Sequence, residues 1–187
     1  MNSPHQSLTE ITDDASLLRM WLTGKGKQTQ KLYTRTVRQF FEFVGRELAD
    51  VHLEDLLQWM ESLSFRHYSK NTVSLKISVV KSLFSYASKI GYLNFNVTAA
   101  LSTPSQVNAL QERFLEQEEV RTLIGAAKPG RDRSLLSLIY TTGLRASEAL
   151  GIDWQDLQPR TNGGQVTVMG KGGKVRTVLI NQSLWQQ

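Results

Sequence analysis

Two short stretches in the second half of the chain carry charged side chains whose spacing suits phosphate chemistry. In the first, residues 142–148 (TGLRASE), a glycine ends an apolar helix and Arg145 follows almost at once. Arginine stays charged and presents a planar fork of donors that matches two oxygens of a phosphate. The alternative is structural, because Arg145 and Glu148 stand three residues apart, the spacing of an ion pair on an exposed helix. Taken by itself, this stretch favours the ion pair.

The second stretch, residues 170–176 (GKGGKVR), surrounds two lysines with glycines. A lysine on such an extended turn could deliver an ammonium group to a phosphodiester. The stretch does not fit a nucleotide-binding P-loop, because Val175 follows Lys174 where a Ser or Thr is required, and because it joins two predicted strands. The alternative is a basic, solvated turn, which is the favoured interpretation of this stretch in isolation.

The elements that must position these residues are mainly helical. Apolar residues at helical spacing predict helices over residues 14–23, 29–44, 53–63, 70–90, 116–127 and 131–142. Thr29 and Ser69 are the expected N-caps of the second and fourth helices, and a short further helix begins near Arg145. Residues 165–169 and 175–180 are β-rich and flank the glycine turn, so they predict a hairpin within a small antiparallel sheet.

An uncharged stretch with a proline and no strong periodicity interrupts the helical pattern after residue 101. We therefore expect one domain over residues 1–103, a linker over residues 104–111 and a second domain over residues 112–187.

The positive charge of the chain is concentrated in blocks. The formal net charge is +5, and residues 25–38 hold five basic and no acidic side chains, as do residues 62–111. Folding can gather such blocks on one face, so a nucleic acid is the expected partner. The alternative is a set of solvated helix faces. Within the first block, Lys31, Arg35 and Arg38 share one helix face and are candidate DNA contacts.

The fourth predicted helix combines an apolar stripe with a face of small polar residues. The stripe is expected to be buried and consists of Val73, Ile77, Val80, Phe84 and Ala87. The polar face consists of Ser74, Ser78, Lys81, Ser85 and Ser88. Hydroxyl groups commonly contact phosphate oxygens, so this face could lie on a DNA backbone. An ordinary serine-rich solvent face fits the pattern equally well.

Composition excludes several classes of protein. The chain has no cysteine, which removes disulfides, thiolate catalysis and Cys-ligated zinc. No apolar run approaches the roughly 18 residues of a membrane span, and the acidic N-terminal residues do not resemble a signal peptide. The expectation is a cytoplasmic protein without a metal, nucleotide or other cofactor.

Together and in this order, the two stretches resemble the tyrosine recombinase, or phage integrase, family. The front third of the chain resembles the family's core-binding domain, and residues 114–120 (FLEQEEV) resemble the opening of its catalytic domain. The resemblance implies a mainly α protein, with a helical, SAM-like core-binding bundle followed by a truncated α+β catalytic domain with a small antiparallel sheet. It also implies site-specific recombination and integration of double-stranded DNA, with other recombinase protomers as partners.

The resemblance also assigns roles to individual residues. In this family a tyrosine attacks a DNA phosphodiester and forms a 3′-phosphotyrosyl link without a metal or a nucleotide. By resemblance, Arg145 clamps the scissile phosphate, Glu148 supports the site and Lys171 is the general acid for the 5′-hydroxyl leaving group. Lys81 falls where the family has a basic residue facing DNA. The other candidate DNA contacts are Lys31, Arg35, Arg38, Lys70, Ser74, Lys76, Ser78, Lys174 and Arg176.

The sequence departs from the family pattern after Lys171. The family's second motif, His-x-x-Arg followed by the nucleophilic tyrosine, is missing, because all three histidines precede residue 70 and the last tyrosine is Tyr140. We therefore expect this chain alone to bind DNA but not to cleave it. We also expect the apolar faces of residues 131–142 and of the sheet to lack their usual cover.

Whether the chain belongs to an enzyme is thus left open by its sequence. It is either one part of a strand-exchange enzyme or a short, non-catalytic DNA-binding protein that competes with or modulates a full-length recombinase. A remnant without a function is the third alternative.

Overall fold

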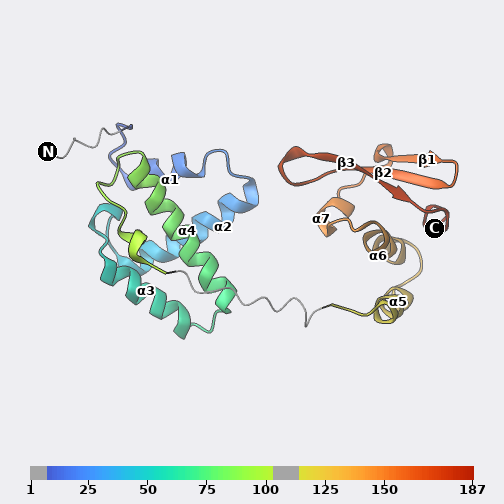
Figure 1. Ribbon diagram of the computed structural model, residues 1–187, viewed down its shortest axis with the longest axis horizontal. Helices are drawn as coiled ribbons and strands as arrows, with labels where there is room; N and C mark the ends of the chain where they lie inside the picture. The colour runs from blue at the N-terminus through green and yellow to red at the C-terminus, as the bar shows by residue number, and fades with distance from the viewer. Residues whose placement is uncertain (1–7, 103–113) are drawn as a thin grey trace. The chain divides into compact units, whose positions relative to one another are not determined.

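A computed structural model describes residues 8–102 and 114–187 of the chain (Figure 1). The chain divides into two compact units, Met1–Ala109 and Leu110–Gln187. The expected linker, residues 104–111, lies outside the described residues. Within the described parts, no helix combines the length and hydropathy that crossing a bilayer requires.

The first unit is a bundle of four α-helices joined by short turns. Its elements are α1 (Asp14–Leu22), α2 (Lys27–Val44), η1 (Leu48–Asp50), α3 (Leu53–Phe65), α4 (Lys70–Lys89) and η2 (Val97–Ala100). Ser69 caps α4 as predicted, because its hydroxyl accepts the Thr72 N–H at 3.2 Å.

The predicted N-cap of α2 was wrong. The helix begins at Lys27 after Gly26, not after Thr29. The side-chain amide of Gln30 donates to the carbonyls of Leu22 and Lys25 at 3.2 and 2.9 Å. These bonds fold the preceding loop onto the first turn, so the helix starts earlier than a capping hydroxyl would suggest.

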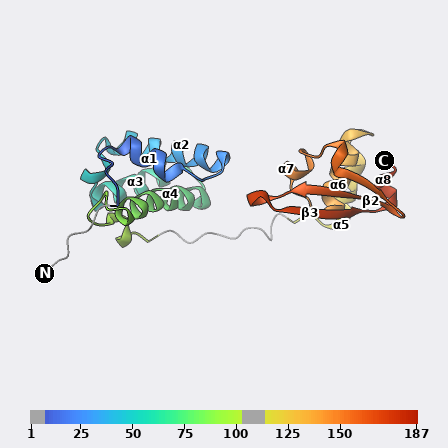
Figure 2. The same cartoon turned by 90° about the horizontal axis from the view of Figure 1, so that it is seen from above.

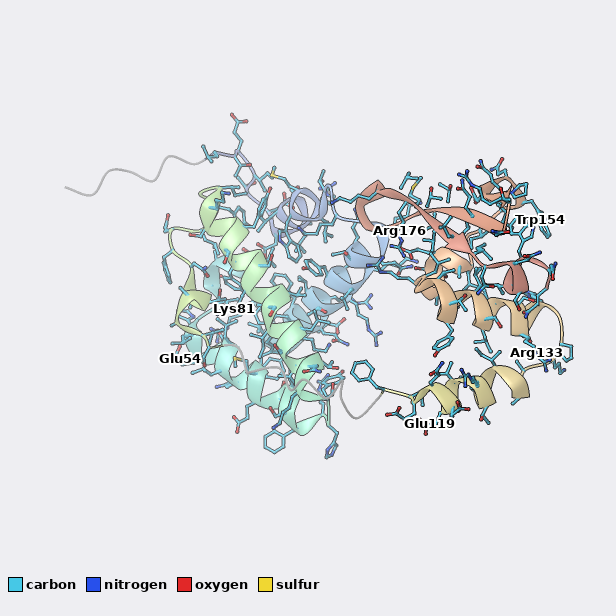
Figure 3. The ribbon with its side chains drawn as sticks, turned by 45° about the vertical axis from the view of Figure 1, so that its right-hand side comes forward. Glu54, Lys81, Glu119, Arg133, Trp154 and Arg176 are labelled. Carbon is cyan, nitrogen blue, oxygen red and sulfur yellow. The ribbon has the colours of Figure 1, made fainter. Side chains whose placement is uncertain are left out.

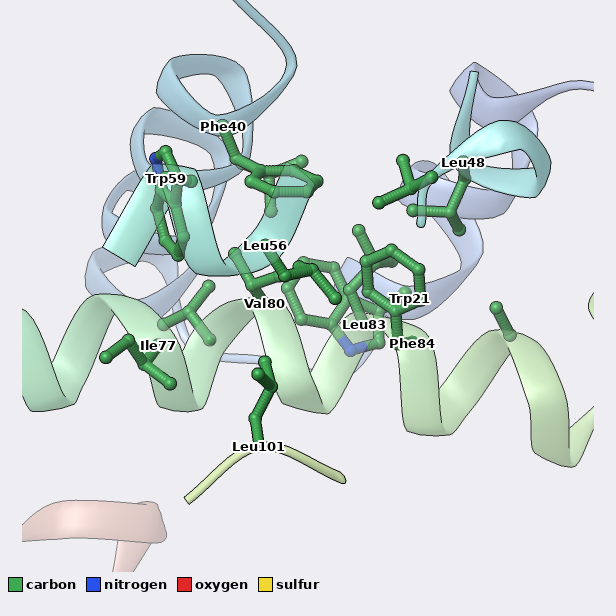
Figure 4. Close-up of a cluster of buried hydrophobic side chains, with 14 of the residues drawn as sticks. Trp21, Phe40, Leu48, Leu56, Trp59, Ile77, Val80, Leu83, Phe84 and Leu101 are labelled. Atoms are coloured by element: carbon green, nitrogen blue, oxygen red, sulfur yellow. The ribbon is translucent and has the colours of Figure 1, made fainter. Parts of the chain in front are cut away.

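The core of the first unit is aromatic and aliphatic (Figure 4). Phe40 on α2 is fully buried and meets Trp59 of α3 edge-on, with ring centroids 5.1 Å apart. It also meets Phe84 of α4 at 6.2 Å, again nearly perpendicular. Edge-to-face pairs of this kind add about 0.5–1.5 kcal/mol beyond the burial of apolar area. Three helices are therefore joined through one ring.

Helix α4 is the central element of the first unit, because it packs against α1, α2, α3 and η2. The predicted buried stripe from Val73 to Ala87 is confirmed. The buried surface is wider than that stripe, however. It also takes in Ser74, Lys76, Val79 and Leu83.

The second unit joins short helices to a small sheet. Its elements are α5 (Gln117–Ala126), α6 (Arg131–Thr142), α7 (Ala146–Ala149), η4 (Trp154–Asp156), β1 (Leu157–Arg160), β2 (Gly163–Met169), η5 (Lys171–Gly173), β3 (Val175–Ile180) and α8 (Gln182–Trp185). The strands are antiparallel in the order β1-β2-β3. The predicted fold class, mainly α with a small antiparallel sheet, is confirmed.

The helices cover one face of this sheet (Figures 1 and 2). Helix α6 packs against β3, and α7 packs against β2. In the β2–β3 ladder, Val166 pairs with Val178 and Val168 pairs with Arg176. Because paired residues of an antiparallel ladder share a face, Arg176 points to the same side as Val178, toward the helices.

Parts of the second unit have little cover. None of the described residues of α5 or α6 is fully buried. An apolar groove of about 820 Å³ runs between α6, the sheet and α8, and its lining includes Leu138, Trp154 and Trp185. On the outer face of the sheet, Met169, Val175 and Leu179 are 71%, 63% and 74% exposed. The lack of cover expected for residues 131–142 is therefore observed, but the one expected for the apolar face of the sheet is not, because Val166, Val168 and Ile180 on that face are buried.

Candidate nucleic-acid interface

The arginine stretch forms a sharp junction between two helices. Helix α6 ends at Gly143, which adopts the left-handed conformation (φ 63°) and donates its N–H to the Ile139 carbonyl at 3.0 Å. Leu144 then enters the core and is 4% exposed. Arg145 follows as the N-cap of α7. The buried leucine and the glycine turn together fix the point at which the arginine leaves the backbone.

Glu148 holds Arg145 at two points. Its carboxylate accepts the backbone N–H of Arg145 at 2.9 Å and the Nη1 of the same residue at 2.7 Å. The Glu148 side chain is only 4% exposed, whereas the Arg145 side chain is 62% exposed. The structural alternative from the sequence, an ion pair at this spacing, is therefore present. Because the Glu148 carboxylate is buried and the Arg145 guanidinium is exposed, the ion pair leaves N–H donors of Arg145 facing solvent.

Arg176 of β3, which is labelled in Figure 3, binds the same carboxylate. Its Nη2 lies 2.9 Å from Oε2 and its Nη1 lies 3.3 Å from Oε1. The Arg176 side chain is 40% exposed. Two guanidinium groups share one carboxylate, so the cluster keeps one net positive charge.

These donors stabilise the ionised form of Glu148. The backbone N–H and the guanidinium of Arg145, together with the charge of Arg176, hold the pKa of the Glu148 carboxyl below its ordinary value, although burial opposes this shift. Glu148 is therefore an acceptor at neutral pH and not a proton donor.

The lysine stretch lies beside this cluster through its backbone. Gly172 and Gly173 have φ values of 77° and 76°, which side chains disfavour, and Gly170 donates its N–H to the Lys174 carbonyl at 2.7 Å. A Cβ at Gly170 would lie 3.3 Å from Oε1 of Glu148. The base of the turn thus rests on the arginine cluster. The backbone of Lys171 lies in this turn, its side chain is outside what the structure describes, and Lys174 is exposed.

The first unit presents a separate basic surface on α2. Lys31, Arg35 and Arg38 are exposed and line a groove of about 480 Å³ together with Lys27. Arg38 also approaches Glu42 at 3.7 Å, in a pair where both side chains are solvated. Exposed pairs of this kind contribute little stability, so Arg38 can exchange Glu42 for a phosphate at small cost.

The expected polar face of α4 is only partly exposed. On this face Ser78 is exposed, but Ser74 is only 1% exposed. Of the two lysines of α4 that were candidate DNA contacts outside this face, Lys70 is exposed and Lys76 is 8% exposed. The prediction that Ser74 contacts DNA directly was therefore wrong, because neighbouring helices cover the surface of α4 that carries it. Lys81 is half-buried, and its ammonium donates to the Leu101 carbonyl.

Lys76 forms a polar cluster inside the first unit. Its ammonium donates to the side-chain oxygen of Gln39 and lies 4.8 Å from the centre of the Tyr68 ring. Burial lowers the pKa of Lys76, and the charges of Arg35 and Arg66 add to that effect, while Tyr68 opposes it. Through its hydrogen bond to Gln39, Lys76 joins α4 to α2.

Two features of the site did not emerge from the sequence. One is the contact between Arg176 and Glu148, and the other is the placement of Arg66 near Lys76. A signal for the first was available: Arg176, Val178 and Ile180 alternate along one strand, so an arginine on the apolar face requires a buried acid as partner.

The chain matches two family descriptions. Residues 14–92 match "Phage integrase, N-terminal SAM-like domain", and residues 113–186 match "Phage integrase family". A curated relative, the tyrosine recombinase XerC of Natranaerobius thermophilus, is 34% identical over 140 residues, which are 72% of this chain and 44% of the relative. The chain spans about half the length of the curated relatives it matches.

Two solved structures share the fold. XerH site-specific recombinase bound to palindromic difH substrate matches with a TM-score of 0.66 and 22% identity, covering 86% of this chain and 51% of XerH. A lambda integrase tetramer bound to a Holliday junction matches with a TM-score of 0.70 and 16% identity, covering 92% of this chain and 55% of the integrase. At these identities the likeness concerns the fold.

Proposed function

Because this chain belongs to the phage integrase family of tyrosine recombinases, we propose that it binds duplex DNA and supplies one part of the active site for site-specific strand exchange. The observation that carries this proposal is the buried Glu148 carboxylate, which holds the guanidinium groups of Arg145 and Arg176 together. The single positive charge that remains on the cluster would be neutralised by a phosphodiester.

Arg145 is the phosphate clamp in this proposal. One edge of its guanidinium is occupied by Glu148, and the exposed donors bind the non-bridging oxygens of the scissile phosphate. Negative charge grows on these oxygens when a nucleophile attacks phosphorus. Donors that Glu148 has already oriented stabilise that charge without further reorganisation. Glu148 itself takes no part in proton transfer.

Lys171 is the proton donor in this proposal. A tyrosine oxygen forms a bond to phosphorus, the bond from phosphorus to the 5′-oxygen breaks, and the leaving oxygen takes a proton from the lysine ammonium. The hairpin turn carries Lys171 next to the cluster that binds the phosphate. In the reverse step the oxygen of a new 5′-hydroxyl forms a bond to phosphorus, its proton returns to the lysine amine, and the bond from phosphorus to the tyrosine oxygen breaks.

The remaining active-site residues come from outside this sequence. No tyrosine follows Tyr140 and no histidine follows His67, so the attacking tyrosine and the second arginine motif must be supplied by another polypeptide segment. We expect this chain alone to bind DNA without cutting it. Further recombinase protomers are the natural partners, as the lambda integrase tetramer on a Holliday junction suggests by analogy.

A second candidate function is modulation of a full-length recombinase. It is favoured by the same sequence observation, since a chain that binds the recombination site but lacks the nucleophile would occupy the site and block exchange. Addition of this chain to a recombination assay with a full-length family member distinguishes the two. Inhibition that depends on Arg145 supports modulation.

The proposed DNA binding is tested by fluorescence anisotropy on duplex DNA over a salt series. Affinity should fall by orders of magnitude between about 50 and 200 mM salt, because each phosphate contact releases counterions. Arg145→Ala should weaken binding, whereas Arg121→Ala, which removes an exposed arginine paired with Glu118, should not. Salt-independent binding would contradict the proposal, and a covalent protein–DNA adduct would show that this chain does cleave.

A further inference from the structure

Arg176 lies between the two stretches that the proposed chemistry needs. It belongs to β3, directly after the glycine turn, yet its side chain crosses to α7 and donates to Glu148 at 2.9 and 3.3 Å. Glu148 in turn accepts both the backbone N–H and the guanidinium of Arg145. One carboxylate thus joins the helix junction to the hairpin.

Among the described residues, the two that flank the turn contribute little packing to it. Met169 and Val175 stand on either side of it and are 71% and 63% exposed, so their burial adds little to its placement. The Gly170 N–H to Lys174 carbonyl bond closes the turn on itself and does not attach it to a helix. We therefore attribute the close approach of Gly170 to the Glu148 carboxylate to the contact between Arg176 of β3 and Glu148 of α7.

The donors of Arg176 are largely committed to this role. A guanidinium offers five N–H donors in a fixed fork. Both terminal nitrogens of Arg176 point at the Glu148 carboxylate, and its side chain is less exposed than that of Arg145, at 40% against 62%. Arg176 and Lys174 are both exposed residues of the hairpin, and what sets Arg176 apart is its pair of contacts with Glu148.

We propose that Arg176 is a positioning residue: through Glu148 it fixes the lysine-bearing turn against Arg145 and holds the Arg145 guanidinium in place. This inference rests on the proposed function for its effect on DNA. Its effect on the hairpin can be measured without DNA. Loss of the guanidinium frees the turn and lets Glu148 and Arg145 rotate, while the strands of the sheet stay paired.

Hydrogen exchange of the full chain, measured by mass spectrometry, tests whether the Arg176–Glu148 contact fixes the lysine-bearing turn. Arg176→Gln should accelerate exchange of the segment 170–176 by about tenfold or more, because a hydrogen bond to a charged group is lost. Exchange in α6 and in β1 should stay as in the wild type. Arg176→Lys should restore part of the protection, since it keeps the charge but not the fork.

Two further variants make this test decisive. Glu148→Gln removes the other partner of the contact and should loosen the same segment, so the inference can be judged even where one variant folds poorly. Arg121→Gln is the matched control, because it breaks an exposed arginine–glutamate pair on α5 with 59% and 79% exposed side chains. Unchanged exchange at 170–176 in Arg176→Gln, or equal acceleration throughout the second unit, would overturn the inference.

A double-mutant cycle on DNA affinity tests the link to Arg145. If Arg176 holds Arg145 in place, Arg145→Ala should weaken DNA binding at least about threefold less in the Arg176→Gln background than in the wild type. Additive losses would overturn the positioning role and indicate that Arg176 contacts DNA independently. If the wild-type chain does not bind DNA, the proposed function fails, and the exchange experiment still decides whether Arg176 tethers the turn.

Discussion

The ammonium of Lys81, a residue in the middle of α4 (Figure 3), donates to the backbone carbonyl of Leu101 in the segment that follows η2. Leu101 itself is 7% exposed and belongs to the core of the first unit. A lysine that the family resemblance assigns to the DNA face is thus also an internal link. Its substitution affects the protein before any DNA is added.

Lys81→Met should therefore lower the free energy of unfolding of the first unit by about 1–3 kcal/mol, because it leaves a carbonyl near the core without its charged donor. Urea denaturation followed by tryptophan fluorescence measures this change. Lys89→Met, at the exposed end of the same helix, is the control and should leave the midpoint unchanged. Equal midpoints for both variants would show that the contact with Leu101 carries no stability.

Arg35→Glu should lower the affinity for DNA while leaving the free energy of unfolding nearly unchanged. Arg35 is exposed on the α2 groove, and its charge also acts on Lys76. Loss of one phosphate contact should reduce the slope of log affinity against log salt by about 0.9. Charge reversal at Lys81 should also weaken binding, while Glu61→Lys on α3 should not. Equal losses for the α2 and α3 variants in a gel-shift series would contradict the placement of the DNA face.

The α4 helix shows how far its sequence pattern could predict burial. Helical spacing identified the apolar stripe correctly, because that stripe must face a core. The pattern does not report how many neighbours a helix has. Since α4 contacts α1, α2, α3 and η2, its buried arc also takes in Ser74, which spacing assigned to the polar face, and Lys76, which was a candidate DNA contact.

Acid should selectively remove the contribution of Glu148 to stability. Its pKa in the folded chain lies below its ordinary value, so the stabilisation is complete above the ordinary carboxyl range and is lost as the pH falls through the lowered pKa. Thermal melts of the wild type and of Glu148→Gln should differ at neutral pH and converge at strongly acidic pH. A difference in Tm that is constant with pH would contradict ionisation of Glu148 as the cause.

The arginine cluster contains one contact that the sequence could predict and one that it could not. The Arg145 to Glu148 contact follows from a spacing of three residues on one helix, so it was predictable as an ion pair. The contact of Arg176 with Glu148 spans 28 residues and depends on the register of β2 with β3 and on the packing of α7 against β2. Neither relationship is a property of local spacing.

Gly164→Ala should destabilise the second unit by about 1–3 kcal/mol through overpacking. A Cβ at Gly164 would lie 2.1 and 2.3 Å from Cε3 and Cζ3 of Trp185, so α8 would have to move. The unfolding midpoint and the emission of Trp185 report this change. Gly125→Ala is the control: nothing lies within 4 Å of its Cβ, and it sits inside α5, so it should raise stability by about 0.5–1 kcal/mol.

The groove of the second unit should bind an apolar dye, because its surface is apolar and open. Trp154 is 90% exposed and lines this groove with Leu138 and Trp185. Trp154→Ser should change the free energy of unfolding by less than about 0.5 kcal/mol, since an exposed side chain loses little burial. It should nevertheless reduce the fluorescence of anilinonaphthalene sulfonate at saturation.

Leu8→Ser is the matched control for this dye experiment, because Leu8 is 77% exposed but belongs to the first unit, whereas the groove is lined by residues of the second unit. It should leave dye fluorescence unchanged. Equal fluorescence for the wild type and both variants would mean that the dye binds elsewhere or not at all. A loss confined to Trp154→Ser would place the principal apolar surface of the chain between α6, the sheet and α8, because that groove is the surface which Trp154 lines.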